Sequence, residues 1–244
     1  MRLHPSHTTV RTGPYTAVRE VTLTRFGQGQ ETERFEVGTL GRVSGSLLAY
    51  GWSRDRAADL REGTEAALNA VQLDERNPYA QYALAVISVF AGALERAIRA
   101  AETAIALSPS FALGHVGLGF ARINAGKAVE AIGPIEHGLR LSPFDPQNFV
   151  WVGNLALAQY FAGHREAALQ TAMRALSIRP GWVPTLETLA ICCAALERLD
   201  EARAFVDQMR QLEKPPDTFA QMKARRPDWA AEMTSMLRKA GLTE

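Results

Sequence analysis

Residues 112–143 read ALGHVGLGFARINAGKAVEAIGPIEHGLRLSP, and this stretch decides the fold. Small residues such as Gly119 and Ala131 let the backbones of two helices approach closely. Between them, Gly126 supplies the left-handed conformation that commonly follows a helix, and Pro143 stops the second helix. The stretch therefore predicts one pair of antiparallel helices joined by a short turn.

The same pattern recurs along the chain. The leucines that fill the space between paired helices stand 34, 37 and 34 residues apart, at Leu84, Leu118, Leu155 and Leu189. Small residues follow thirteen positions later, at Ala97, Ala131, Ala168 and Ala202. Helix-stopping prolines close the units, at Pro109, Pro143, Pro180 and, one position late, Pro215. We predict four units over residues 78–214, stacked side by side because no unit buries its apolar face alone.

Three local departures carry predictions of their own. The insertion Pro143–Pro146 explains the 37-residue step and predicts a longer turn there. Glu197 stands where the fourth unit should have its turn glycine. Pro134 lies inside a second helix, which we expect to bend.

The flanking segments match the repeat less well. Residues 39–77 indicate a divergent first helix pair, near 40–50 and 56–73. Residues 215–244 indicate capping helices near 218–224 and 228–240. The last of these carries one apolar face, formed by Trp229, Met233, Met236 and Leu237. Residues 1–38 form either a weak β-hairpin of strands 18–24 and 34–37 or a disordered tail, and both interpretations stay open.

Composition excludes several classes of protein. The formal net charge is +1, with 27 basic and 26 acidic residues, so we expect no nucleic-acid partner. The two cysteines, Cys192 and Cys193, are adjacent and lack the spacing of a zinc site, which favours a reduced, cytoplasmic protein. No secretory signal is recognisable at the N-terminus. The longest nearly apolar stretch, 82–94, is too short to span a membrane, so we expect no membrane association.

No catalytic motif is present in the sequence. The glycine-rich stretch 114–126 has neither the spacing nor the preceding strand of a nucleotide-binding loop. The histidines form no metal-binding pair at helical spacing; they are His4, His7, His115, His137 and His164. We therefore expect no enzyme activity, no catalytic residues, no metal and no cofactor.

The repeat resembles the tetratricopeptide repeat (TPR). The resemblance implies an all-α, right-handed α-solenoid of about four to five helix-turn-helix units with a C-terminal capping helix. The large aromatic residue that TPR units carry in the first helix is replaced here by smaller or polar residues, at Ser88, Arg122, Gln159 and Cys193.

The TPR resemblance also implies a groove lined by the first helices. Its residues here are Tyr79, Tyr82, Val86, Phe90, Val116, Phe120, Ile123, Asn124, Asn154, Leu157, Tyr160, Phe161, Glu187 and Ile191. Tyr82 and Val86 replace the lysine and asparagine with which related proteins bind acidic chaperone tails. Two interpretations stay open: this surface is buried by repeat packing or by residues 1–38, or it binds an amphipathic or apolar protein segment. Self-association into a homo-oligomer also stays open.

Three strings narrow the resemblance: LSPFDP at residues 141–146, YGWS at 50–53 and LRKAGL at 237–242. Together they look like the C-terminal TPR region of bacterial class III adenylate cyclases and winged-helix transcriptional regulators. This implies a non-catalytic scaffold for protein–protein interaction in bacterial signalling or regulation. The alternative is a regulatory array of a nucleotide cyclase or a transcriptional regulator, stand-alone or truncated.

Overall fold

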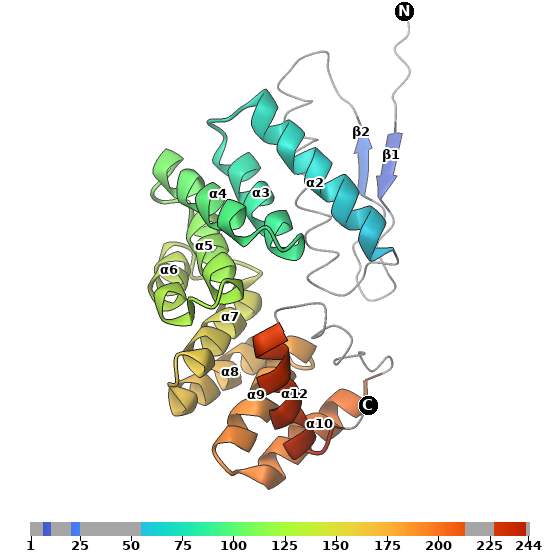
Figure 1. The fold of residues 1–244 in the computed structure, drawn as a ribbon, viewed down its shortest axis with the longest axis vertical. Helices are drawn as coiled ribbons and strands as arrows, with labels where there is room; N and C mark the ends of the chain where they lie inside the picture. Colours follow the sequence, from blue (N-terminus) through green and yellow to red (C-terminus); the bar gives the residue numbers. More distant parts are fainter. Residues whose placement is uncertain (1–6, 11–20, 25–54, 213–226, 243–244) are drawn as a thin grey trace, which may run out of the picture. The chain divides into compact units, whose positions relative to one another are not determined.

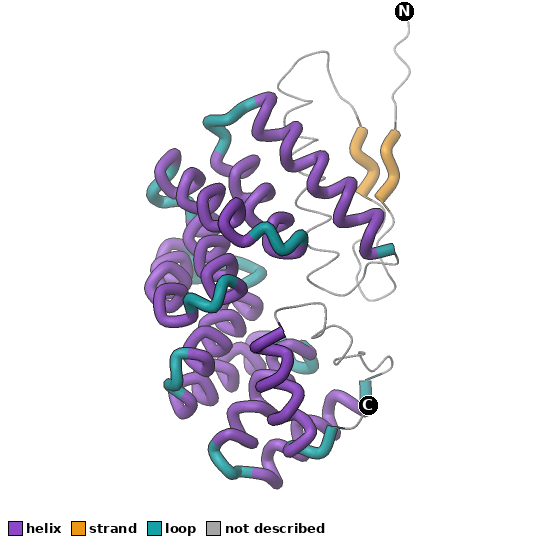
Figure 2. The backbone as a smooth tube through the Cα atoms, viewed as in Figure 1, coloured by secondary structure: helices purple, strands orange, loops and turns teal. Residues whose placement is uncertain are grey.

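The structure, a computed structural model, describes residues 7–10, 21–24, 55–212 and 227–242. These residues are almost entirely helical (Figure 2). The chain separates into two compact units, Met1–Pro109 and Ser110–Glu244, which are described in turn. The predicted segments 34–37, 40–50 and 218–224 lie outside the described residues.

The described part of unit 1 contains one helical hairpin and a long helix that precedes it. The hairpin consists of α3 (Pro78–Phe90) and α4 (Leu94–Leu107), and α2 (Arg56–Leu73) packs on α3. Small residues at the contact, such as Ala85 and Ala97, are fully buried, as the repeat pattern predicts.

Two short strands are also described in unit 1. β1 (His7–Val10) and β2 (Val21–Thr24) pair antiparallel, with His7 opposite Thr24. β2 coincides with the second half of the stretch 18–24 that the sequence indicated as a strand.

In the part of unit 2 that the structure describes, three hairpins are followed by a separate helix (Figure 1). The hairpins are α5 (Ala112–Asn124) with α6 (Ala128–Leu141), α7 (Asn148–Phe161) with α8 (Arg165–Ile178), and α9 (Val183–Ala195) with α10 (Leu199–Arg210). Each later hairpin packs its first helix on the second helix of the hairpin before it, through the pairs α6–α7 and α8–α9. The predicted all-α fold of stacked hairpins is confirmed.

The last described helix, α12 (Pro227–Lys239), packs on α9. The side chains of Met233 and Leu237 are buried in one apolar cluster with Ile191 and Cys192 of α9. The expected C-terminal capping helix is therefore confirmed.

The turns within the hairpins follow the predicted chemistry. Gly92, Gly126 and Gly163 have positive φ angles of 72°, 77° and 87°. Glu197 takes the same conformation with φ 61° and is the only non-glycine residue of the described ranges to do so. The predicted longer turn covers residues 142–147, whereas the corresponding turn between α8 and α9 covers residues 179–182.

Helix α6 continues through Pro134, and an arginine from the neighbouring helix satisfies the backbone there. A proline has no N–H, so the carbonyl of Glu130 lacks its usual donor four residues later. That carbonyl accepts a hydrogen bond of 3.1 Å from Nη1 of Arg122 on α5. The residue that replaces the expected aromatic thus compensates for the proline of the facing helix.

Candidate partner-binding surface

The fourteen predicted groove residues all lie on first helices of hairpins, namely α3 in unit 1 and α5, α7 and α9 in unit 2. We call the four on α3 the unit 1 face: Tyr79, Tyr82, Val86 and Phe90. We call the ten on α5, α7 and α9 the unit 2 face. Whether either face binds a partner stays a prediction, but the structure shows how much of each side chain is accessible.

On the unit 1 face, Tyr79 is 56% exposed, and Tyr82, Val86 and Phe90 are half-buried. Their spacing of three to four residues places them along one side of α3. The cap of the helix holds this end in place, because Oδ1 of Asn77 accepts hydrogen bonds from the backbone N–H groups of Tyr79 (2.9 Å) and Ala80 (3.3 Å). The result is an aromatic and aliphatic stripe that begins at an accessible tyrosine.

The unit 2 face divides into buried and half-buried residues. The half-buried ones lie on α5 and α7, which pack against each other: Phe120, Asn124, Asn154, Leu157 and Phe161. The buried ones occur on all three helices: Val116, Ile123, Tyr160, Glu187 and Ile191. The buried residues present almost no surface to a partner in this structure.

Part of that burial comes from α12. The indole of Trp229 stacks on the ring of Phe161, with centroids 4.1 Å apart and an angle of 13° between the planes. Trp229 is only 6% exposed and belongs to one apolar cluster with Ile123 of α5 and Leu155 of α7. The sequence indicated the apolar face of this helix, but spacing alone did not show that its tryptophan reaches α7.

Two of the buried residues of the unit 2 face carry a polar group, namely Tyr160 and Glu187. Burial raises the pKa of the Tyr160 phenol above its usual value, and the negative charge of Glu232 on α12 raises it further. The phenol therefore stays protonated at neutral pH. It is placed to interact with α12 and not to act as a base.

The two thiols are also poorly suited to catalysis. Cys192 and Cys193 are free and fully buried. Burial raises the pKa of Cys192 to about 12 and that of Cys193 to about 11. Because the thiolate is the reactive form, both groups are weak nucleophiles at neutral pH.

Among the described residues, sequence spacing missed one feature with possible metal chemistry, a pair of histidines. His115 of α5 and His137 of α6 have ring centroids 4.4 Å apart, at an angle of 60°. They approach because their helices form a hairpin. Protein zinc sites use three or four ligands, and within the described ranges no group of three His, Cys, Asp or Glu residues is placed to hold a metal ion.

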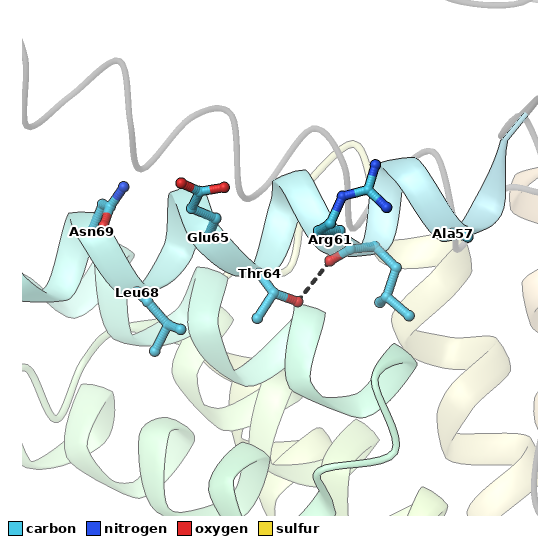
Figure 3. A pocket seen from close by; sticks show the side chains of 7 residues that line it. Ala57, Arg61, Thr64, Glu65, Leu68 and Asn69 are labelled. Atoms are coloured by element: carbon cyan, nitrogen blue, oxygen red, sulfur yellow. Dashed lines mark hydrogen bonds between the residues drawn. The ribbon is translucent and has the colours of Figure 1, made fainter.

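A shallow pocket lies on α2 of unit 1 (Figure 3). The described residues that line it come from α2 alone: Ala57, Leu60, Arg61, Thr64, Glu65, Leu68 and Asn69. The hydroxyl of Thr64 donates to the carbonyl of Leu60 at 2.7 Å, so its donor is already used within the helix. These side chains form no catalytic constellation.

Among the described helices, none combines the length and apolarity that crossing a bilayer requires.

No protein-family model matches the sequence, and a comparison with curated proteins finds no match. Solved structures do match. PilF of Pseudomonas aeruginosa superposes with a TM-score of 0.62 at 15% identity, over 88% of this chain and 90% of that one. A thermophilic TPR protein of Thermus thermophilus gives 0.60 at 20% identity, over 83% and 99%. YrrB, a TPR protein with an unusual peptide-binding site, gives 0.50 at 20% identity, over 72% and 91%. At these identities the likeness concerns the fold, and the fold of this chain is that of the TPR proteins.

Proposed function

We propose that the protein is a non-catalytic scaffold that binds other proteins through the first helices of its hairpins. The observation that carries this proposal is the unit 1 face, where Tyr79 is 56% exposed beside three half-buried apolar side chains on α3. Tyrosine contributes a large, rigid contact area at a low entropic cost, and it is enriched among residues that dominate binding energy. The protonated, buried state of both thiols gives further support.

The chemistry of the two faces indicates the kind of partner. Apart from the buried carboxyl group of Glu187, their side chains are aromatic, aliphatic and amide-bearing, and no lysine or arginine is among the fourteen. Such a surface suits an apolar or amphipathic segment of a protein and not an acidic tail or a nucleic acid. The partner would therefore be held mainly by burial of apolar area, with little dependence on salt concentration.

Site-specific crosslinking in the native host tests this proposal. A photoreactive amino acid replaces Tyr79 on the unit 1 face or Leu157 on the unit 2 face. A matched control carries it at Met173, which is 47% exposed on α8, a second helix. We expect crosslinks to one protein from the two faces and not from Met173. Crosslinks that arise only from Met173 would place the binding surface on the second helices instead.

The double variant Tyr82→Ala and Phe161→Ala then measures the contribution of the aromatic residues. Removal of two anchors from a partner interface is expected to weaken binding by at least about tenfold. Met173→Ala serves as the control with unchanged affinity. A partner that binds the double variant as tightly as the wild type contradicts the assignment of these faces. Light scattering of the purified chain shows whether that partner is a second copy.

The bacterial signalling context is part of the same proposal and is supported by the three strings that resemble the cyclase-associated and regulator-associated TPR regions. Two of them lie in described segments: LSPFDP overlaps the long turn, where Phe144 is 95% exposed, and LRKAGL spans the end of α12 and the residues after it. The alternative is that the array regulates a cyclase or a DNA-binding domain directly. Identification of the crosslinked protein by mass spectrometry separates the two, since the alternative requires that it carry such a domain.

A further inference from the structure

The position of α12 differs from that of a further repeat. Within unit 2 each new first helix packs on the preceding second helix, as α7 does on α6 and α9 on α8. A helix that continued this series would pack in the same way on α10. Instead, α12 packs mainly on α9, which is itself a first helix (Figure 1), although Leu237 also shares an apolar cluster with Met209 of α10. It therefore lies on the side of the hairpins where the groove is expected.

The contacts of α12 follow the unit 2 face from one first helix to the next. At its C-terminal end, Leu237 is fully buried in the same cluster as Ile191 of α9. At its N-terminal end, Trp229 stacks on Phe161 of α7. Between them, Glu232 lies close enough to Tyr160 of α7 for its charge to raise the pKa of that phenol. An apolar face with a deep aromatic anchor at one end is how an amphipathic helix occupies a groove.

The polar interactions that hold α12 and the residue Gly241 after it are more exposed than its apolar contacts. Nζ of Lys239 lies 2.6 Å from Oε1 of Glu197, whose side chain is 74% exposed. Nη2 of Arg210 donates to the carbonyl of Gly241 at 2.7 Å. Exposed ion pairs contribute little to stability, so the apolar face supplies most of what holds α12 in place. A different helix with the same apolar pattern would make the same main interactions.

We propose that the unit 2 face is a binding site for an amphipathic helix, and that α12 occupies it in cis as an internal competitor. The inference rests on the proposed scaffold function and names the class of partner. The partner helix places an aromatic side chain on Phe161, as Trp229 does, and aliphatic or thioether side chains four and eight positions later, as Met233 and Leu237 do. Its binding requires that α12 leave.

Competition in cis has a measurable consequence. A tethered helix acts at a high effective concentration, so it weakens the apparent affinity of a free helix in proportion to the fraction of chains in which the site is open. A change that loosens α12 without altering the face should therefore strengthen binding of a free helix. A change to the face itself should weaken it.

The test uses the full chain and a fluorescent peptide of residues 227–242, PDWAAEMTSMLRKAGL. Trp229→Ala in the chain is expected to raise the affinity for this peptide by about tenfold or more, because a buried tryptophan anchor is lost from the competitor only. Ser235→Ala, at an exposed position of the same helix, is the matched control and should bind like the wild type. Phe161→Ala added to Trp229→Ala should reverse the gain, and so should Trp229→Ala in the peptide.

A second measurement keeps the contact residues intact in case Trp229→Ala unfolds the chain. A protease site placed between residues 213 and 226 allows the tether to be cut after folding. The labelled peptide should then exchange with the released α12, and light scattering should show a monomer before cleavage. Failure of the peptide to bind after cleavage, equal binding with and without Phe161, or a dimer that exchanges α12 between copies would each overturn the inference. If crosslinks from Tyr79 still identify a protein partner, the scaffold function stands without it.

Discussion

Gly119 of α5 lies directly against the side chain of Ile135 on α6, so closely that a Cβ atom on the glycine would overlap with Cγ1 of the isoleucine. Gly119→Ala should therefore force the α5–α6 hairpin apart and destabilise unit 2 by about 1–3 kcal/mol. Gly133, in α6, has no atom within 4 Å of its would-be Cβ. Gly133→Ala should instead be neutral or stabilise by up to about 1 kcal/mol, because alanine favours a helix. The urea midpoints of the two variants give the comparison, and equal midpoints would contradict the close packing.

The hydrogen bond from Arg122 to the carbonyl of Glu130 should depend on Pro134. Arg122→Ala leaves that exposed carbonyl to water and should cost about 0.5–1.5 kcal/mol. In a Pro134→Ala background the N–H of residue 134 can donate within the helix, so the same substitution should cost distinctly less. A double-mutant cycle of unfolding free energies measures this coupling. Additive effects would mean that Arg122 stabilises the hairpin in some other way.

The left-handed turn positions should respond to substitution in opposite directions. Gly163 has φ 87° and open space around its would-be Cβ, so Gly163→Ala should cost about 1–2 kcal/mol through backbone strain alone. Glu197 already bears that strain, and Glu197→Gly should relieve it. The comparison is made in a Lys239→Ala background, which removes the ion pair from both chains. Thermal denaturation compares Gly163→Ala with the wild type, and Glu197→Gly in the Lys239→Ala chain with Lys239→Ala alone. A lower midpoint for the chain with Glu197→Gly would refute the prediction.

The buried thiols should make the protein less stable in alkaline solution. The pKa of Cys192 is about 12 in the folded chain, against a usual value near 9, so the folded state holds this proton more tightly. The stabilisation is complete below pH 9 and is lost as the pH rises towards 12, by up to about 1.4 kcal/mol per pH unit. Urea unfolding at a series of alkaline pH values should show this decline. Cys192→Ala should make it shallower, while Met173→Ala leaves it unchanged.

The repeat period allowed the hairpins to be predicted because the relevant interactions are local or nearly so. Close helix packing requires a small residue such as Ala97, and a left-handed turn requires a residue such as Gly126. These requirements recur at fixed spacing and can be counted in the sequence. The turn without a glycine could also be identified in the sequence, because Glu197 occupies the position where glycine was expected. In the structure this residue has the positive φ of the other turns.

The candidate surface was harder to predict because burial there depends on segments far apart in the chain. Tyr160 and Phe161 are neighbours on α7, yet the first is buried and the second half-buried. The difference reflects the helical rotation between them, whereas the burial of Phe161 depends on a stacking contact with Trp229 of the distant helix α12. The contact between His115 and His137 was missed for a similar reason, because it joins two helices and has no spacing signature within either.

Translation proceeds from the N-terminus, so the ribosome makes α12 after every other helix that the structure describes. Until Trp229 and Leu237 emerge, the apolar side chains that they cover on α7 and α9 remain exposed to water. A nascent chain in this state offers a ready surface to molecular chaperones or to another unfinished copy. Completion of α12 therefore also ends a period in which these side chains are vulnerable to aggregation during biosynthesis.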